Sequence, residues 1–199
     1  DLGHGPFSHT LEPVTNEILG TDHMEFTGQI ILGKEDNVFE DERKEFKDVK
    51  RIPEVLESYG IEPQEVAALV RGKREDYLGQ IVHSTVDVDQ LDYLLRDAHY
   101  TGVAHGVIDT DRVIETLTVF ENQLVIDKKG LAAIEGLLVA RALMYSSVYF
   151  HKTVRIAEMM VARAVEGLAE TSKDDISNVR KMVDAELMGW LLDKGGYQR

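Results

Sequence analysis

The sequence predicts an all-α domain that carries one small β-hairpin. Apolar residues recur at helical spacing through most of the 199 residues. Prolines and glycines fall where helices begin and end, and only one short stretch reads as two paired strands. Hydrophobic residues make up 43% of the chain, which is enough for a core at this length. These observations favour helices packed on helices.

In the first half of the chain, turn residues separate short predicted helices. A helix over residues 8–19 follows the turn at Gly5-Pro6, and Gly33 ends a helix over residues 23–32. Residues 34–51 are rich in charge and are predicted to form a solvated, mobile connection. Four further helices are expected over residues 53–59, 63–71, 76–84 and 87–100.

A hairpin is predicted just beyond the middle of the chain. It follows a short helix expected over residues 111–116. Residues 118–120 and 124–126 are apolar or β-branched and flank Glu121-Asn122-Gln123, a pattern typical of two strands joined by a tight turn.

The last third of the chain is predicted to be helical. The apolar period over residues 131–169 indicates one very long helix, or two helices joined near His151. A last helix is expected to run to Leu192, with Asp174 or Asp175 as its N-cap.

Composition narrows the classes of function. The formal charge is −14, whereas a broad nucleic-acid interface needs a basic face, so none is expected. There is no cysteine, which excludes disulfides, Cys-ligated zinc and thiol nucleophiles. No apolar run approaches the length of a membrane span and no signal-peptide pattern is visible. A cytoplasmic protein without a membrane partner is therefore predicted.

A first group of candidate functional residues opens the chain: Asp1, His4, His9, Glu12 and His23. Imidazole and carboxylate are the ligands of borderline divalent metals. His9 and Glu12 are three residues apart on one face of a predicted helix. A carboxylate beside an imidazole orients the ring and raises its pKa, which suits a general acid or base. The alternative is that these are ordinary polar residues of a loop and a helix end.

A second group lies in the predicted helix over residues 87–100. Asp89, Tyr93, Arg96 and Asp97 share one face of that helix. Neighbouring acids repel one another unless a cation or hydrogen bonds offset their charge, so a ligand is one explanation of the group. The other is that acids near a helix N-terminus simply suit the helix dipole.

A third group forms a stripe along the long helical region. Arg141, Tyr145, Tyr149 and Lys152 are spaced by four, four and three residues. Arginine grips phosphate oxygens bidentately, and tyrosine stacks on or hydrogen-bonds to a nucleoside. The alternative is that the tyrosines are half-buried packing residues and the arginine is a surface charge.

Three motifs resemble one known family. The run Asp1-Leu2-Gly3-His4-Gly5-Pro6-Phe7-Ser8-His9 resembles the signature of HD-domain phosphohydrolases, as it reads in the deoxynucleoside triphosphate (dNTP) triphosphohydrolase branch. Residues 87–97 resemble that branch's Asp-x-Asp-x-x-Asp-Tyr-x-x-Arg-Asp, and residues 149–152 its Tyr-x-His-Lys. The resemblance runs in order from Asp1 to about Arg155. It implies the all-α HD fold, with the hairpin as a small insertion.

The resemblance implies a metal site and a catalytic group. Asp1 and Asp89 would bind a divalent metal ion (Mg, Mn, Fe, Ni or Zn), together with two histidines expected upstream of this chain. The implied catalytic group consists of His4 and His9, facing the substrate phosphates, Glu12 as an acidic partner, and His23.

The resemblance also implies a nucleoside site made of Tyr93, Asp97, Arg141, Tyr145 and Tyr149. In it Tyr93 packs against the sugar and excludes a 2′-hydroxyl, and Asp97 binds the 3′-hydroxyl. Arg141 grips a phosphate. Two positions depart from the family: Gln90 replaces a lysine that some members place beside the triphosphate, and Tyr145 stands where the best-known vertebrate member has histidine.

The implied reaction converts a dNTP into a deoxynucleoside and tripolyphosphate. Two alternatives stay open: an HD phosphohydrolase for a nucleoside monophosphate or cyclic nucleotide, and a non-catalytic nucleotide-binding module. By resemblance, a homo-oligomer and a nucleotide effector are also expected. We predict an HD domain over residues 1–170, with its first part missing upstream, and a helical extension over residues 171–199. The fragment alone is expected to be inactive or weakly active.

Overall fold

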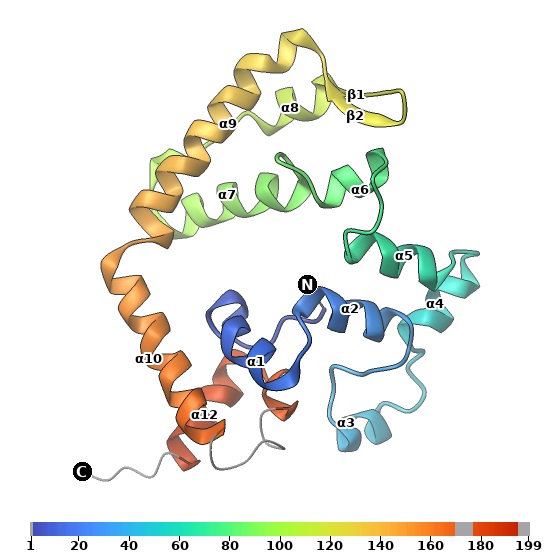
Figure 1. The fold of residues 1–199 in the computed structure, drawn as a ribbon, viewed down its shortest axis with the longest axis vertical. Coiled ribbons are helices and arrows are strands. Elements are labelled where there is room, and N and C mark those ends of the chain that lie inside the picture. Colours follow the sequence, from blue (N-terminus) through green and yellow to red (C-terminus); the bar gives the residue numbers. More distant parts are fainter. Residues whose placement is uncertain (1, 170–176, 195–199) are drawn as a thin grey trace. The chain divides into compact units, whose positions relative to one another are not determined.

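The structure is a computed structural model that describes residues 2–169 and 177–194 (Figure 1). The chain divides into two compact units, which are described separately. Unit 1 comprises residues 1–71 with 156–199, and unit 2 comprises residues 72–155. The division into an HD domain and an extension after residue 170 stays a prediction.

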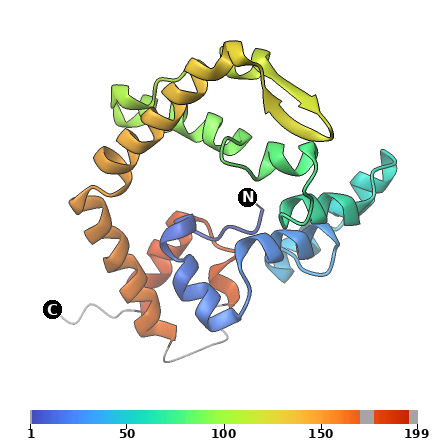
Figure 2. The ribbon, with the colours of Figure 1, turned by 45° about the horizontal axis from the view of Figure 1, so that its top comes forward.

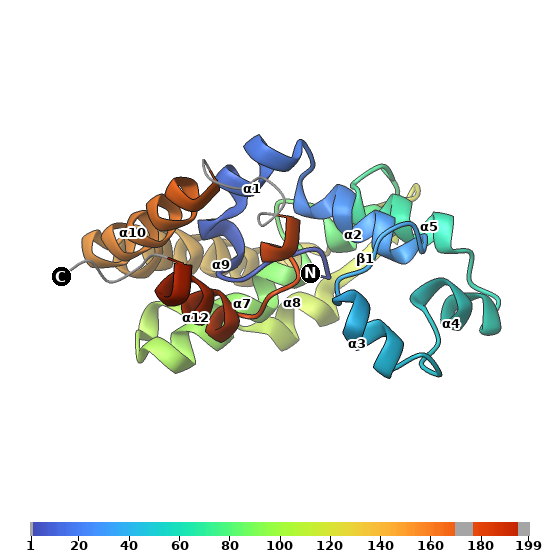
Figure 3. The same ribbon diagram turned by 90° about the horizontal axis from the view of Figure 1, so that it is seen from below.

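Unit 1 is built from helices. These are α1 (Glu12–Leu19), α2 (His23–Ile31), α3 (Glu40–Glu45), α4 (Ile52–Ser58), α5 (Pro63–Val70), most of α10 (Lys152–Ala169) and α12 (Asp184–Lys194) (Figures 1 and 3).

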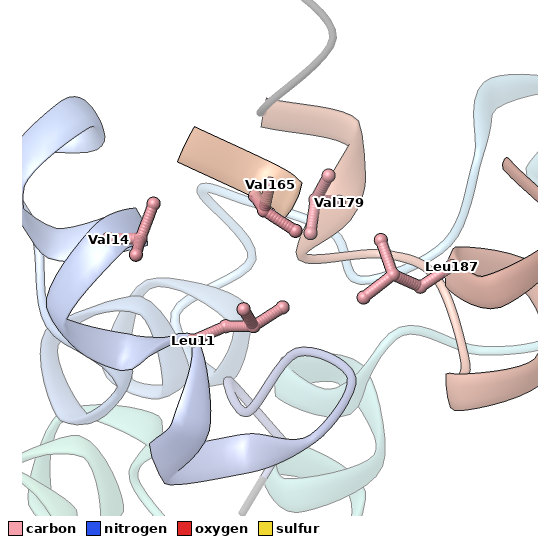
Figure 4. Close-up of a cluster of buried hydrophobic side chains, with 5 residues drawn as sticks. All are labelled: Leu11, Val14, Val165, Val179 and Leu187. Carbon is pink, nitrogen blue, oxygen red and sulfur yellow. The ribbon is translucent and has the colours of Figure 1, made fainter. Parts of the chain in front are cut away.

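The core of unit 1 joins the beginning of the chain to its end. Its buried side chains are Leu11, Val14, Val165, Val179 and Leu187 (Figure 4). They come from α1 and the residue before it, from α10, from the segment that follows residue 176, and from α12. Burying them together removes apolar surface from water, which holds these four regions against one another.

The predicted helix over residues 8–19 is divided in two. Residues Ser8–Thr10 form a single 3-10 turn, and the α-helix begins only at Glu12. Pro13 explains the difference, because it has no N–H to donate to the carbonyl four residues earlier and so must lie in the first turn. Ahead of the turn, Phe7 and Ser8 have positive φ angles of 53° and 38°.

Aspartates begin several of the helices. The Asp22 carboxylate accepts from the N–H of Glu25 at 2.7 Å and caps α2, and Asp87 caps α7 (Val88–Thr101) by accepting from Gln90 at 2.9 Å. Such caps satisfy N–H groups that have no partner within the helix. They place His23 and Asp89 at defined positions in the first turns.

Residues 34–51 contain more structure than the sequence predicted. The short helix α3 lies within them, and Arg43 donates two hydrogen bonds of 2.7 Å to Asp36. This bidentate ion pair closes the segment into a loop. Most of the segment is exposed, as predicted, and the helix and the ion pair add local order that the sequence analysis did not predict.

Unit 2 packs helices beside one hairpin. Its elements are α6 (Tyr77–Val82), α7, α8 (Thr110–Thr116), β1 (Leu117–Phe120), β2 (Gln123–Ile126), α9 (Leu131–Met144) and a π-helical turn over Tyr145–Tyr149. The strands are antiparallel, with Phe120 opposite Gln123 (Figure 2). The turn is thus two residues long, and Glu121 and Asn122 take the positive φ angles that a tight hairpin requires.

The long helical region consists of two helices, which confirms one of the two alternatives predicted from the sequence. α9 continues into the π-helical turn, and α10 begins at Lys152, directly after His151. The last helix was predicted less well. It is α12, which begins at Asp184, while Asp174 and Asp175 lie outside the described residues.

One helical stretch differs from the prediction that no apolar run approaches the length of a membrane span. Lys128–Tyr149 is long and apolar enough to cross a bilayer by length and composition alone. Leu137 and Met144 within it are buried in the core of unit 2 together with side chains of α7 and α8, while Val139 is 59% exposed. Core helices pass the same test, so this finding is weak evidence for a membrane.

Candidate active site

Glu12 joins two of the predicted histidines. Its Oε2 is 2.9 Å from Nδ1 of His9, and its Oε1 hydrogen-bonds to Nδ1 of His23. A carboxylate only accepts, so both rings donate through Nδ1 and turn Nε2 away from Glu12. This is the arrangement that fixes an imidazole's tautomer and leaves its second nitrogen for proton transfer.

The two rings differ in exposure. The side chain of His9 is 73% exposed, whereas those of His23 and Glu12 are 24% and 23% exposed. Burial alone would raise the pKa of Glu12, but the hydrogen bonds from His9 and His23 outweigh it and lower that pKa. The carboxylate therefore stays ionised, and His9 is the member of the group that a substrate reaches most easily.

His4 completes the cluster of rings. Its ring stacks on His23 with centroids 4.1 Å apart and meets His9 edge-on at 4.9 Å. Burial, followed by the neighbouring imidazoles, lowers the pKa of His4 to about 4. The ring is neutral near pH 7, so it offers hydrogen bonding to a substrate without adding positive charge.

Close packing around Gly3 sets the position of His4. The Gly3 N–H donates to Oγ1 of Thr27 at 2.8 Å, and a Cβ at Gly3 would collide with Thr27 and with the carbonyl oxygen of His23. Thr27 in turn donates to that carbonyl at 2.7 Å. Only glycine permits this approach of the His4 segment to α2.

Sequence reasoning missed Arg180. It lies beside Glu12, Asn16 and His23 around a cavity of about 10 Å³, roughly the size of one water molecule. The Arg180 side chain is 7% exposed. No local sequence pattern signals it, because its partners lie more than 150 residues away along the chain.

In unit 2, the predicted nucleoside residues come together. The Tyr149 hydroxyl donates to Oδ2 of Asp97 at 2.7 Å. The ring of Tyr149 meets Tyr93 at 6.0 Å and Tyr145 at 5.0 Å, both edge-to-face, and the Arg141 guanidinium lies 5.6 Å from the Tyr145 ring centroid. All five residues are half-buried, so they form one polar-aromatic cluster between α7 and α9.

The surroundings in this cluster favour the neutral form of Tyr93 and Tyr149 and the charged form of Arg141. Burial, then the neighbouring Tyr145, raises the pKa of Tyr93 to about 12. Burial and the hydrogen bond to Asp97 raise the pKa of Tyr149. Burial works against the charge on Arg141, but contacts with Tyr145 and Tyr93 raise its pKa overall. Near neutral pH the cluster therefore offers hydroxyl donors and one positive charge.

The predicted metal ligands are only partly described. Asp1 lies outside the described residues, and Asp89 is an exposed carboxylate in the first turn of α7. Over residues 2–169 and 177–194, no three His, Asp or Glu side chains are arranged to hold a metal ion. Asp89 fits a divalent cation by donor type, but the described residues do not complete a site.

Comparison with known proteins adds three kinds of similarity. A family model described as an HD associated region matches residues 108–199. An uncharacterized protein of Methanocaldococcus jannaschii is 38% identical over 195 residues, covering 96% of this chain and 37% of that protein. A Dictyostelium discoideum protein named deoxynucleoside triphosphate triphosphohydrolase SAMHD1 homolog is 27% identical over 177 residues, covering 82% of this chain and 31% of that protein.

A solved structure shares the fold. The crystal structure of a phosphohydrolase from Bacteroides thetaiotaomicron aligns with a TM-score of 0.70 and 27% identity, covering 99% of this chain and 50% of that one. This chain thus spans half or less of the length of these proteins. The similarity confirms the predicted all-α HD fold with its small hairpin.

Proposed function

We propose that this chain, a member of the HD-domain phosphohydrolase superfamily, is part of an enzyme that hydrolyses dNTPs to deoxynucleoside and tripolyphosphate. The hydrogen bond from Tyr149 to Asp97, with Tyr93 beside it, is the observation that carries the choice of substrate. Asp97 is an acceptor suited to a sugar hydroxyl, and a flat ring packed beside it leaves little room for a second hydroxyl.

Unit 1 contributes the acid–base chemistry of this proposal. Water attacks the α-phosphorus and releases one proton, the bond from phosphorus to the 5′-oxygen breaks, and that oxygen takes up a proton. His9 supplies this proton from Nε2, because Glu12 holds its Nδ1 and fixes the orientation of the ring, and the proton released by the water restores His9. His23, held by the second oxygen of Glu12, keeps the carboxylate in place.

Positive charge must offset the charge of the triphosphate. Arg141 is one source of it within unit 2. HD phosphohydrolases generally use divalent metal ions, and we propose Asp1 and Asp89 as carboxylate ligands. When bound, such an ion supplies positive charge beside the phosphates.

A second candidate is an HD phosphohydrolase that acts on a nucleotide with fewer phosphates. Gln90 favours it, because the side chain is 6% exposed and donates through Nε2 to the Ser84 carbonyl at 3.3 Å. A neutral, inward-facing amide adds no charge where some relatives have lysine. One cation fewer suits a monophosphate or cyclic nucleotide better than a triphosphate.

Product analysis on the full-length protein tests both candidates. Each dNTP, a deoxynucleoside monophosphate and a cyclic nucleotide would be incubated with Mg²⁺ or Mn²⁺, singly and in mixtures, and the products separated. We expect deoxynucleoside and tripolyphosphate, and loss of turnover in Asp89→Asn. Asp92→Asn is the matched control, because Asp92 is 65% exposed on the same helix and pairs with Arg96. Turnover of the other nucleotides alone would reject the dNTP assignment.

A further inference from the structure

Arg180 contacts the segments of unit 1 that lie next to His4, Glu12 and His23. Its backbone lies against Gly5, where a Cβ would come within 3.2 Å of the Arg180 Cα, so it borders the segment that carries His4. Val179, the preceding residue, is fully buried in the core of unit 1 (Figure 4). The backbone at residue 180 is thus held in place by packing.

The Arg180 side chain bridges the two elements that Glu12 also joins. Nη2 donates to Oδ1 of Asn16 at 3.3 Å, one helical turn beyond Glu12 on α1. Nη1 donates to Oγ1 of Thr21 at 2.7 Å, and Nη2 donates to the Thr21 carbonyl, two residues before His23. The guanidinium also lies 5.2 Å from the centroid of the Phe26 ring on α2.

Burying the Arg180 guanidinium costs free energy, which is not expected of a residue that only fills space. Burial lowers the pKa of Arg180, although the charges of Asp22 and Glu12 oppose that shift. The three oxygens that accept from it, on Asn16 and Thr21, carry no formal charge. A buried guanidinium with neutral partners is expensive to desolvate, whereas its planar fork of donors can fix two backbone segments at once.

We propose that Arg180 is a positioning residue, which sets the distance between Glu12 and His23 and thereby aligns His9 for proton transfer. This inference deepens the proposed function and rests on it for its catalytic consequence. Proton transfer from His9 is sensitive to this alignment, because a displacement of about 1 Å can lower the rate about 100-fold. The residue acts through Asn16 and Thr21 and does not touch the substrate.

The first test measures the imidazoles directly and does not depend on any reaction. Hydrogen–deuterium exchange at the ring Cε1 carbon of His9 and His23 would be followed by mass spectrometry in full-length wild type and Arg180→Gln. We expect the exchange rates of both rings to change. Arg163→Gln is the matched control, because Arg163 lies in unit 1 with a side chain 76% exposed, and it should leave both rates unchanged. Unchanged rates in Arg180→Gln would overturn the proposal.

A milder variant keeps the test decisive if Arg180→Gln does not fold. Thr21→Val removes the Oγ1 acceptor but leaves the Thr21 carbonyl and the arginine in place. We expect the rate at His23 to change in the same direction and by a smaller amount. A folded Thr21→Val protein with wild-type exchange at His23 would also overturn the proposal.

Kinetics then test the catalytic consequence on whichever nucleotide the protein hydrolyses. We expect Arg180→Gln to lower kcat by about 10-fold or more and to change KM by less than about threefold, because alignment acts on the transition state. Arg180→Lys keeps the charge but loses the fork, so it should not restore kcat. Full restoration by lysine would reject the geometric role. Absence of any turnover in wild type would count against the proposed function, while the exchange measurements would still decide the role of Arg180.

Discussion

Two carboxylates in this protein each orient other side chains through hydrogen bonds. Glu12 holds two imidazoles through its two oxygens, and Asp97 accepts the hydroxyl of Tyr149. In each case the carboxylate orients a side chain from another element of the fold. The hydrogen bonds from its two partners lower the pKa of Glu12 in spite of burial, so that carboxylate stays ionised.

Glu12→Gln tests the acid–base pair. The amide accepts through its oxygen alone, so at least one of the two imidazoles loses its acceptor and the orientation of His9 is no longer fixed by a carboxylate. We expect kcat to fall by at least roughly 100-fold, within the range of general acid catalysis. Steady-state kinetics on the full-length protein would measure it, with Glu17→Gln as control, since Glu17 is an exposed residue of the same helix. Equal activity in both variants would contradict the role of Glu12.

The Tyr93 phenol provides a test by pH. Its folded pKa of about 12 lies above the ordinary value of 10, so the fold favours the neutral form. That contribution to stability is full below pH 10 and is lost as the pH rises toward 12. In a spectrophotometric titration, the phenolate absorbance missing from Tyr93→Phe should therefore appear only above about pH 11. A difference spectrum already complete near pH 10 would refute this environment for Tyr93.

At the level of secondary structure, the π-helical turn decides which way the tyrosines face. Tyr145–Tyr149 follows α9 without a break, and its wider turn carries one extra residue compared with an α-helix. Sequence spacing of four between Arg141, Tyr145 and Tyr149 correctly placed them on one stripe. It did not reveal the π-helical turn, because no residue pattern in this stretch distinguishes it from an α-helix.

Inserting one alanine after Ser147 tests the turn. The turn already holds one residue more than an α-helix, so a further residue rotates Tyr149 by about 100° relative to α9, which breaks its hydrogen bond to Asp97. We expect the circular dichroism signal for helix to be retained while KM for the nucleotide rises. Ser147→Ala is the control of unchanged length, and it loses only the bond to the Leu143 carbonyl. An insertion variant with wild-type KM would mean that the orientation of Tyr149 does not matter for binding.

Over the whole molecule, the end of the chain supports the beginning. Val179 and Leu187 share a core with Leu11 and Val14 (Figure 4). Leu11 and Val179 also line the small cavity beside Glu12 and His23. The histidine-bearing segment therefore depends on residues that follow it by more than 160 positions. Residues 2–9 of the motif are therefore held in place by packing within the whole of unit 1.

Leu187→Ala tests that dependence. The side chain is fully buried, so the variant should lower the free energy of unfolding by about 2–5 kcal/mol, from lost burial and the cavity left behind. Met188→Ala is the matched control, because Met188 is 42% exposed on the same helix, and it should change stability by less than about 0.5 kcal/mol. Denaturant unfolding measures both. Similar values for the two variants would argue that the end of the chain adds little to the core.

The sequence by itself determined the all-α class, the hairpin and most helices, because apolar period, prolines and capping aspartates act over a few residues. From the same residues we predict which side chains carry the chemistry. Only the tertiary structure decided that Glu12 serves both His9 and His23, and that Arg180 reaches Asn16 and Thr21 from 164 and 159 residues away. Such contacts depend on how helices pack, and packing energy comes from the whole buried core, which no local pattern encodes.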